Sequence, residues 1–326
     1  MKVMWDRLVF SKSCLSILAW VLCAASALAQ DQSFRVESRV VQVPVTVTDA
    51  KGHNVEGLTA RDFTVLDDNQ PRQITLDTFS TGAAPITLVI AVQNSAISAA
   101  ALAKIRRIGG MIQPLVIGRR GEAAVLTFDS DIEWTRDFTH SSDALQIAIR
   151  SLTIGSPTQA RMFDAVLNAA GHMKQRPGRK VLLILSETRD RGSKAHLDEV
   201  LRTVEREGIE IFAASWSAYA STFADKSGEL PPPSEANYLK VFTELARLGK
   251  TNDLRALTQA TGGSDYPFLK QSAVEKAIES LGVEVHSQYI LSFPPQSGHE
   301  GMHQIAVSLP GRGNLLIHAR QAYWTD

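Results

Sequence analysis

Hydrophobic and polar positions alternate with a period of two near both ends of the chain. Val41, Val43, Val45 and Val47 are separated by polar residues or proline, which is the pattern of a half-buried strand. Further strands are predicted at 63–66, 72–79, 289–293, 303–309 and 315–320, with turns at 49–54 and 67–69 and a helical turn capped by Thr59. Both ends are therefore predicted to form antiparallel β-structure.

The middle of the chain alternates between short aliphatic runs and amphipathic segments. The patterns predict strands at 86–92, 123–128, 181–186 and 209–215, and helices at 97–113, 142–152, 162–174, 195–207, 238–248, 253–261 and 272–282. Continuously apolar strands between helices are typical of a parallel sheet covered on both faces. A helix C-cap is expected at Gly262–Gly263. The segment 218–235, rich in Ser, Gly and Pro, is predicted to be an exposed insertion.

The strands at either end are too few to form an independent sandwich. We therefore predict that the N-terminal strands pair with the C-terminal strands, so that both ends of the chain belong to one β module. The predicted boundaries are 1–29 for a leader, 30–82 for the N-terminal β module, 83–286 for the α/β domain and 287–326 for the C-terminal strands.

The leader has the pattern of an export signal. Lys2, Arg7 and Lys12 precede an apolar run at 14–25, and the small-x-small site 27–29 precedes Gln30. We expect cleavage near Ala29 and a periplasmic or extracellular location; a membrane anchor is the alternative, and the shortness of the run argues against it.

The charge, cysteine content and apolar runs of the residues after the leader limit the kinds of partner that are expected. Without the three basic residues and one acidic residue of the leader, 31 basic and 33 acidic residues remain, which gives no electrostatic case for nucleic acid or anionic membranes. Both cysteines, Cys14 and Cys23, lie in the leader, so the mature chain is expected to fold without disulfides. No second long apolar run is present, and membrane insertion of the mature chain is not expected.

Several segments of the sequence resemble those of one protein family. The segments 45–68, 257–263, 287–291 and 319–323 are similar to the von Willebrand factor A (VWFA)-related family of secreted proteins of the acidobacterial type. The resemblance implies a doubly wound, mainly parallel α/β domain of the A type, inserted in or joined to a small antiparallel β-sandwich. It also implies an adhesion site in which oxygen ligands from three loops hold Mg²⁺ or Mn²⁺.

The ligand positions implied by this resemblance have largely changed. The Asp-x-Ser-x-Ser of the first loop falls on Ala91, Gln93 and Ser95, the threonine of the second loop on Ala160, and the third loop on Ser186-Glu187-Thr188. Ala91 and Ala160 offer no side-chain oxygen, and Mg²⁺ gives up its water reluctantly. We therefore expect a degenerate site without a metal or other cofactor; binding of Mg²⁺ or Mn²⁺ is the alternative.

The sequence thus favours a non-enzymatic adhesion or interaction protein with a protein partner. The predicted partner-binding rim consists of Gln93, Asn94, Ser95, Thr158, Glu187, Thr188, Arg189 and Asp190. Three alternatives remain open: the loops are merely eroded and the partner binds elsewhere, a partner carboxylate completes a metal site, or the protein is a zinc hydrolase.

The hydrolase alternative depends on one motif. His299-Glu300-Gly301-Met302-His303 spells H-E-x-x-H, which binds zinc when it lies on a helix. Pro294–Pro295 before it, Gly301 within it and the alternation after it predict a hairpin tip instead. Asp67-Asp68-Asn69 is predicted to be a turn, because it lacks the spaced carboxylates of a calcium loop, and Asp129-Ser130-Asp131 is predicted to be a solvated turn at a strand end rather than a cation site.

Overall fold

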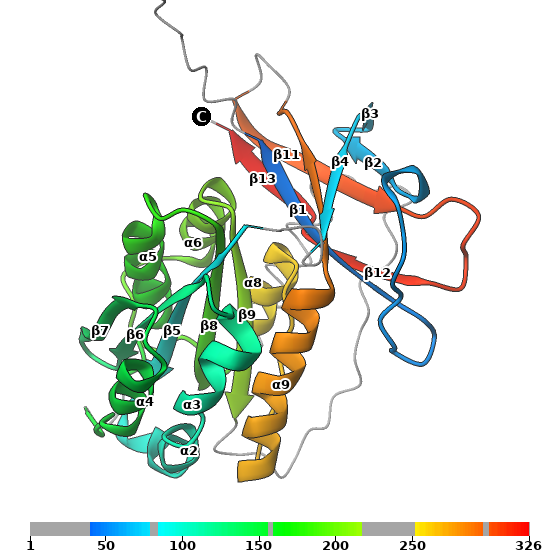
Figure 1. Cartoon of the computed structure of the whole chain (residues 1–326). Coiled ribbons are helices and arrows are strands. Elements are labelled where there is room, and N and C mark those ends of the chain that lie inside the picture. Colours follow the sequence, from blue (N-terminus) through cyan, green and yellow to red (C-terminus); the bar gives the residue numbers. More distant parts are fainter. Residues whose placement is uncertain (1–39, 79–83, 156–158, 217–251, 296–299, 326) are drawn as a thin grey trace, which may run out of the picture. The chain divides into compact units, whose positions relative to one another are not determined.

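The computed structural model describes residues 40–78, 84–155, 159–216, 252–295 and 300–325 (Figure 1). The predicted export signal, the insertion at 218–235, the helix at 238–248 and the rim residue Thr158 lie outside these ranges. In the part that is described, no helix is long and apolar enough to cross a membrane.

A five-stranded sheet forms the centre of the α/β domain. Its order is β7-β6-β5-β8-β9, where β5 is Ile86–Gln93, β6 Glu122–Phe128, β7 Ile132–Thr139, β8 Arg179–Glu187 and β9 Ile209–Trp216. β5, β6, β8 and β9 are parallel, and β7 runs antiparallel at one edge. The predicted doubly wound, mainly parallel sheet is confirmed, and the edge strand β7 is an addition to the prediction.

Helices cover both faces of this sheet. One face is packed by α2 (Ala99–Ile105), α3 (Gly109–Ile112), α4 (Ser142–Arg150) and α9 (Gln271–Ser287), and the other by α5 (Met162–Met173), α6 (Leu197–Arg206) and α8 (Asp253–Thr261). Successive residues of a strand point to opposite faces, so Leu88 and Ile90 join the first core while Val89 and Ala91 join the second. Burial on both faces explains the continuous apolar runs.

The prediction of one helix over 97–113 is wrong. The segment forms a 3-10 turn at Ala96–Ser98, then α2, α3 and a π-helical turn at Gln113–Ile117. Gly109 packs against α4 so closely that a Cβ there would lie 2.8 Å from the Cα of Gln146. Pro114 lacks the N–H that a continuous helix would use. Pro114 stands in the turn that follows α3, so the packing of Gly109 against α4 is what explains the break within a segment whose apolar spacing alone is helical.

Cap residues fix the ends of two other helices. The hydroxyl of Ser141 accepts the N–H of Ala144 at 3.2 Å and begins α4. The side chain of Asn252 accepts the N–H of Arg255 at 2.9 Å and begins α8. Gly262 ends α8 with φ 84°, as predicted, and a Cβ there would lie 2.7 Å from the backbone nitrogen of Arg320. Both the left-handed backbone and the close approach favour glycine.

The two ends of the chain form a pair of four-stranded antiparallel sheets, with orders β12-β1-β10-β4 and β13-β11-β2-β3. The strands are β1 (Val41–Thr48), β2 (Thr64–Asp67), β3 (Gln70–Arg72), β4 (Thr75–Thr78), β10 (Tyr289–Phe293), β11 (Gly301–Ser308), β12 (Leu316–Ala319) and β13 (Ala322–Thr325). N-terminal β1 lies between the C-terminal strands β10 and β12, and β2 lies beside β11. The predicted pairing of the two ends is confirmed, and the exact domain boundaries stay a prediction.

Details of β1 and the last strands differ from the sequence pattern. Val43, Val45 and Val47 enter the sandwich core as predicted, but Pro44 and Thr46 on the opposite face are also buried. Pro44 lies beyond the end of β12, which pairs only with residues 45–48, so a residue without an N–H is tolerated there. The segment predicted as one strand at 315–320 ends at Ala319, and a further strand, β13, joins the other sheet.

Candidate functional site

The candidate site lies where the direction of the sheet connections reverses. From β5 the chain passes to β6 on one side, and it later returns to β8 on the other side. The carboxyl ends of strands that flank such a switch point are where open α/β sheets bind ligands. Residues 93–95 end and follow β5, Asp129 follows β6, and residues 187–190 end and follow β8.

Gln93 links the loops after β5 and β8. Its side chain is fully buried. Its carbonyl oxygen accepts the backbone N–H of Glu187 at 2.8 Å, and its Nε2 donates to the Ser95 hydroxyl oxygen at 2.8 Å. The Ser95 and Ser98 hydroxyl oxygens lie 3.3 Å apart. A neutral hydrogen-bonded bridge therefore joins the residues that, by the family resemblance, would provide cation ligands.

Ala91 and Ala160 lie in apolar surroundings. Both are buried in the core that also contains Met162. The N–H of Ala160 donates to the carbonyl of Arg191 at 2.9 Å, and the Arg191 N–H donates back to the carbonyl of Ala160 at 2.8 Å. Backbone pairing therefore connects the loop before α5 to the loop after β8.

Two polar acceptor atoms at the rim make no hydrogen bond with the described residues. One is Oε2 of Glu187, whose side chain is 6% exposed and lies 3.4 Å from the guanidinium of Arg191 without hydrogen-bond alignment. The other is Oδ1 of Asn94, whose Nδ2 donates to the carbonyl of Thr153 at 3.2 Å. Buried acceptors without donors are destabilising, and such atoms are unusual in folded proteins.

The remaining predicted rim residues divide by role. Asp190 accepts the N–H of Phe163 at 3.0 Å and the Ser193 hydroxyl at 2.6 Å, so it holds the first turn of α5. The carbonyl of Thr188 accepts the N–H of Asp253 at 2.8 Å, which ties the same loop to the start of α8. Arg189 is exposed, and its Nε lies 3.7 Å from the Asp253 carboxylate. Among the described residues of the predicted rim, Arg189 is therefore the exposed one.

Two further carboxylates support the rim and were not predicted. Asp164 accepts the N–H groups of Ala195 and Lys194 and an N–H of Arg161; burial raises its pKa, but these donors outweigh burial and hold the pKa below its usual value. The prediction of a solvated turn is wrong for Asp129, which is only 7% exposed. A Cβ at Gly155 would lie 1.9 Å from its Oδ2.

The H-E-x-x-H segment does not form a helix where it is described. Residues 301–308 form the strand β11, and His303 pairs with Tyr323 of β13; His299 lies outside the described ranges. The prediction of a non-helical segment is confirmed there, because a strand does not place residues four apart as a helix would.

We expect Gln93→Ala to lower the free energy of unfolding by about 2 kcal/mol, because it leaves the buried N–H of Glu187 without an acceptor. Urea unfolding would measure the change. Gln73→Ala, at an exposed position, is the matched control and should change stability by less than about 0.5 kcal/mol. Equal effects of the two substitutions would contradict the bridging role of Gln93.

Comparisons with known proteins found similar solved structures, all at low sequence identity. No family model matches the sequence, and no curated protein matches it significantly. Similar solved structures include BatB from Bacteroides thetaiotaomicron, at 11% identity and a TM-score of 0.42 over 61% of this chain and 99% of that chain. They also include a von Willebrand factor type A protein from Catenulispora acidiphila, at 10% identity and a TM-score of 0.46 over 90% of this chain and 76% of that chain.

A third similar structure is proximal thread matrix protein 1 from the mussel byssus, solved with a zinc-occupied MIDAS motif. It has 14% identity and a TM-score of 0.46, and the match covers 67% of this chain and 49% of that chain. All three matches have TM-scores below 0.5. The doubly wound, mainly parallel fold that the sequence indicated is established by the order and direction of the strands in the chain's own sheet.

Proposed function

We propose that this protein is a non-enzymatic interaction or adhesion protein that binds a protein partner through the rim of its A-type domain. The observation that carries the proposal is the Gln93 bridge, in which a buried carboxamide joins Ser95 to the backbone of Glu187. It supports a rim that keeps its shape without a bridging cation. The partner would be met outside the cytoplasm if residues 1–29 act as an export signal.

The chemistry of the rim fits recognition by hydrogen bonds. The exposed guanidinium of Arg189 offers hydrogen-bond donors to a partner, whereas the acceptor atoms of Glu187 and Asn94 lie buried beneath the rim surface. No cation is needed for such a contact.

A capture assay with the wild type and two variants tests the proposal. We expect the mature chain, immobilised as bait, to capture a defined protein from extracellular or periplasmic extracts of the producing cells, and Arg189→Glu to reduce that capture at least tenfold. Arg136→Glu, on the exposed side of edge strand β7, is the matched control and should leave capture unchanged. Equal capture by wild type and Arg189→Glu would show that the partner binds somewhere other than the rim.

The alternative in which a partner carboxylate completes a metal site predicts a different result. In that case capture would need Mg²⁺ or Mn²⁺ and would be lost with EDTA, whereas our proposal expects equal capture with and without chelator. We also expect millimolar Mg²⁺ to leave the thermal midpoint of the isolated protein unchanged, since a ligand stabilises a protein only if it binds the native state.

A further inference from the structure

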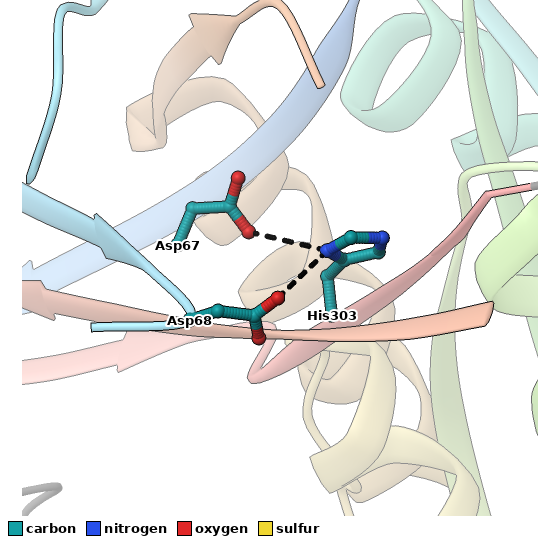
Figure 2. A group of neighbouring side chains, drawn as sticks. All are labelled: Asp67, Asp68 and His303. Atoms are coloured by element: carbon teal, nitrogen blue, oxygen red, sulfur yellow. Dashed lines mark hydrogen bonds and ion pairs between the residues drawn. The ribbon is translucent and has the colours of Figure 1, made fainter. Parts of the chain in front are cut away.

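We propose a divalent metal site in the β-sandwich, formed by Asp67, Asp68 and His303 with Zn²⁺ as its best candidate occupant. One ligand atom from each of the three residues lies within 4.8 Å of the other two. Figure 2 shows both carboxylates turned toward the same ring nitrogen of His303. The residues come from the end of β2, the turn after it and the strand β11.

Asp67 supplies the observation that sets this cluster apart from a surface turn. Its side chain is fully buried. Its Oδ2 accepts from Nε and Nη2 of Arg72, at 2.9 and 2.7 Å, and from the hydroxyl of Tyr323 at 3.1 Å. Its Oδ1 makes no hydrogen bond with any residue that the structure describes, and it lies 3.7 Å from Nδ1 of His303. A buried carboxylate oxygen without a donor is a position at which a cation, a proton or a water would be stabilised.

The second ring nitrogen of His303, Nε2, faces away from the two carboxylates and has its own hydrogen-bond partner. The ring is 1% exposed and stacks on Tyr323 with centroids 4.8 Å apart. Nε2 lies 2.9 Å from the hydroxyl oxygen of Thr325, and that hydroxyl donates to the carbonyl of Gly301 at 3.5 Å. With the threonine oxygen as acceptor for Nε2–H, the lone pair of a neutral ring lies on Nδ1 and faces two carboxylates; in the other tautomer Nδ1–H donates to Asp68 and Nε2 accepts the threonine hydroxyl. The first arrangement requires a cation or a proton at Nδ1.

Asp68 completes the ligand set from a tight turn. Asp68 and Asn69 have φ of 49° and 63°, which is the backbone of a two-residue hairpin between β2 and β3. Oδ1 of Asp68 accepts the N–H of Gln304 at 2.9 Å, and Oδ2 lies 2.8 Å from Nδ1 of His303. The turn therefore aims the second carboxylate oxygen at the same point as Asp67.

This pattern is that of a metal centre with an outer shell. In each of the three ligands, the atom that does not face the common point is held by a hydrogen bond, an arrangement that orients metal ligands in proteins. Tetrahedral Zn²⁺ with ligands at about 2.0–2.2 Å places neighbouring ligand atoms roughly 3.3 Å apart. The observed distances of 2.8 and 3.7 Å lie on either side of that spacing.

The mixed ligand set also selects among metals. An imidazole with two carboxylates suits a transition metal better than Ca²⁺, which takes six or more oxygen ligands. The side chain of Asp68 is 25% exposed, so water can reach a fourth position. The metal would join the β2–β3 hairpin to β11, and its expected role is structural.

A proton on Nδ1 is the competing occupant. An imidazolium would satisfy Asp68 and balance the two carboxylates together with Arg72, but its one Nδ1–H is already directed at Asp68, and Oδ1 of Asp67 would remain without a donor. A metal ion satisfies both carboxylates at once. The two occupants predict opposite responses to added zinc.

The test uses the tag-free mature protein, stripped of metal with a chelator and dialysed. We expect calorimetric titration with ZnCl₂ to show one site whose affinity falls at least tenfold in Asp68→Asn, and we expect zinc at 100 times its Kd to raise the thermal midpoint by about 5 °C. Asp68→Asn is chosen because asparagine tolerates a positive φ and keeps an acceptor for the N–H of Gln304.

Two control variants assign any binding to this site. Asn69→Gly keeps the turn and should keep zinc affinity within twofold, while Asp68→Asn should weaken it at least tenfold, roughly the scale of outer-shell changes in known zinc sites. Glu187→Gln, at the rim of the A-type domain, should also bind normally. Absence of a zinc-dependent midpoint shift in the wild type, or zinc affinity unchanged by Asp68→Asn, would overturn the proposal and leave the proton as the occupant.

Discussion

Replacing Arg179 with methionine is expected to lower the free energy of unfolding by about 3–5 kcal/mol, the usual cost of removing one partner of a buried ion pair. Nη2 of Arg179 lies 3.0 Å from Oε2 of Glu210, and the two side chains are 6% and 4% exposed. Nη1 donates to the carbonyl of Val285 at 2.9 Å, and Nη2 also contacts Gln288. One guanidinium therefore joins β8, β9, the end of α9 and the residue before β10.

The carboxylate left behind explains the size of the effect. Burial raises the pKa of Glu210, and Arg179 offsets that rise. Without the arginine, the carboxylate must either remain charged in an apolar site or bind a proton, and both cost free energy at neutral pH. The backbone carbonyl of Val285 also loses its donor.

Urea unfolding with a constant m-value would measure the loss. Arg202→Met is the matched control, because Arg202 pairs with Asp198 at 2.9 Å on the surface, with side chains 46% and 63% exposed; it should cost less than about 1 kcal/mol. The double variant Arg179→Met/Glu210→Met should recover part of the loss, since no uncompensated charge remains. A loss below about 1 kcal/mol for Arg179→Met would show that the pair contributes little.

The protein is expected to become less stable as the pH rises from 5 to 8, because of Glu205 on α6. Its side chain is buried, Oε2 makes no hydrogen bond with the described residues, and the charge that acts on it is that of Arg320, which is itself buried. Burial raises the pKa of Glu205 from 4.5 to about 7, and Arg320 lowers it only in part. Between pH 4.5 and about 7, Glu205 is therefore protonated in the native state and ionised in the unfolded state.

The sign follows from proton linkage. Between pH 4.5 and 7 the native state binds more protons than the unfolded state, so the free energy of unfolding falls with rising pH. A shift from 4.5 to about 7 corresponds to a total loss of about 3 kcal/mol, at 1.36 kcal/mol per pKa unit. Asp265, whose pKa burial raises to about 6, acts in the same direction.

A difference measurement isolates the contribution of Glu205. Urea unfolding at pH 5 and pH 8 should show a smaller decline for Glu205→Gln than for the wild type, and the variant should be the more stable protein at pH 8. Glu199→Gln, at an exposed position on the same helix, should retain the decline of the wild type. Parallel pH profiles for wild type and Glu205→Gln would contradict the assignment.

Much of the fold could be predicted because burial imposes a period on the sequence. Strands covered on both faces, such as β5 and β8, read as continuous aliphatic runs, and β1 carries valine at every second position. The edge strand β7 was missed because its exposed residues, among them Glu133 and Arg136, interrupt any apolar run. The break between α2 and α3 was missed because it depends on the close approach of Gly109 to another helix.

The candidate rim was only partly predictable from the sequence. The topology of parallel strands placed residues 93–95 and 187 at the same edge, since carboxyl ends of parallel strands meet there. The hydrogen bond from Glu187 to Gln93 depends on strand register, which the sequence does not reveal. Asp68 and His303 are 235 positions apart, and only the pairing of β2 with β11 brings them together.

The position of β1 between two C-terminal strands constrains the order in which parts of the protein can fold during synthesis. The valine-rich β1 is made early, yet its partners β10 and β12 are made more than two hundred residues later. The continuous α/β segment between them can fold first. Until β10 and β12 are synthesised, both edges of β1 remain unpaired, and unpaired strand edges favour self-association. Nascent chains interrupted before residue 289 should therefore contain a folded α/β part and an aggregation-prone N-terminal segment, which the last forty residues protect.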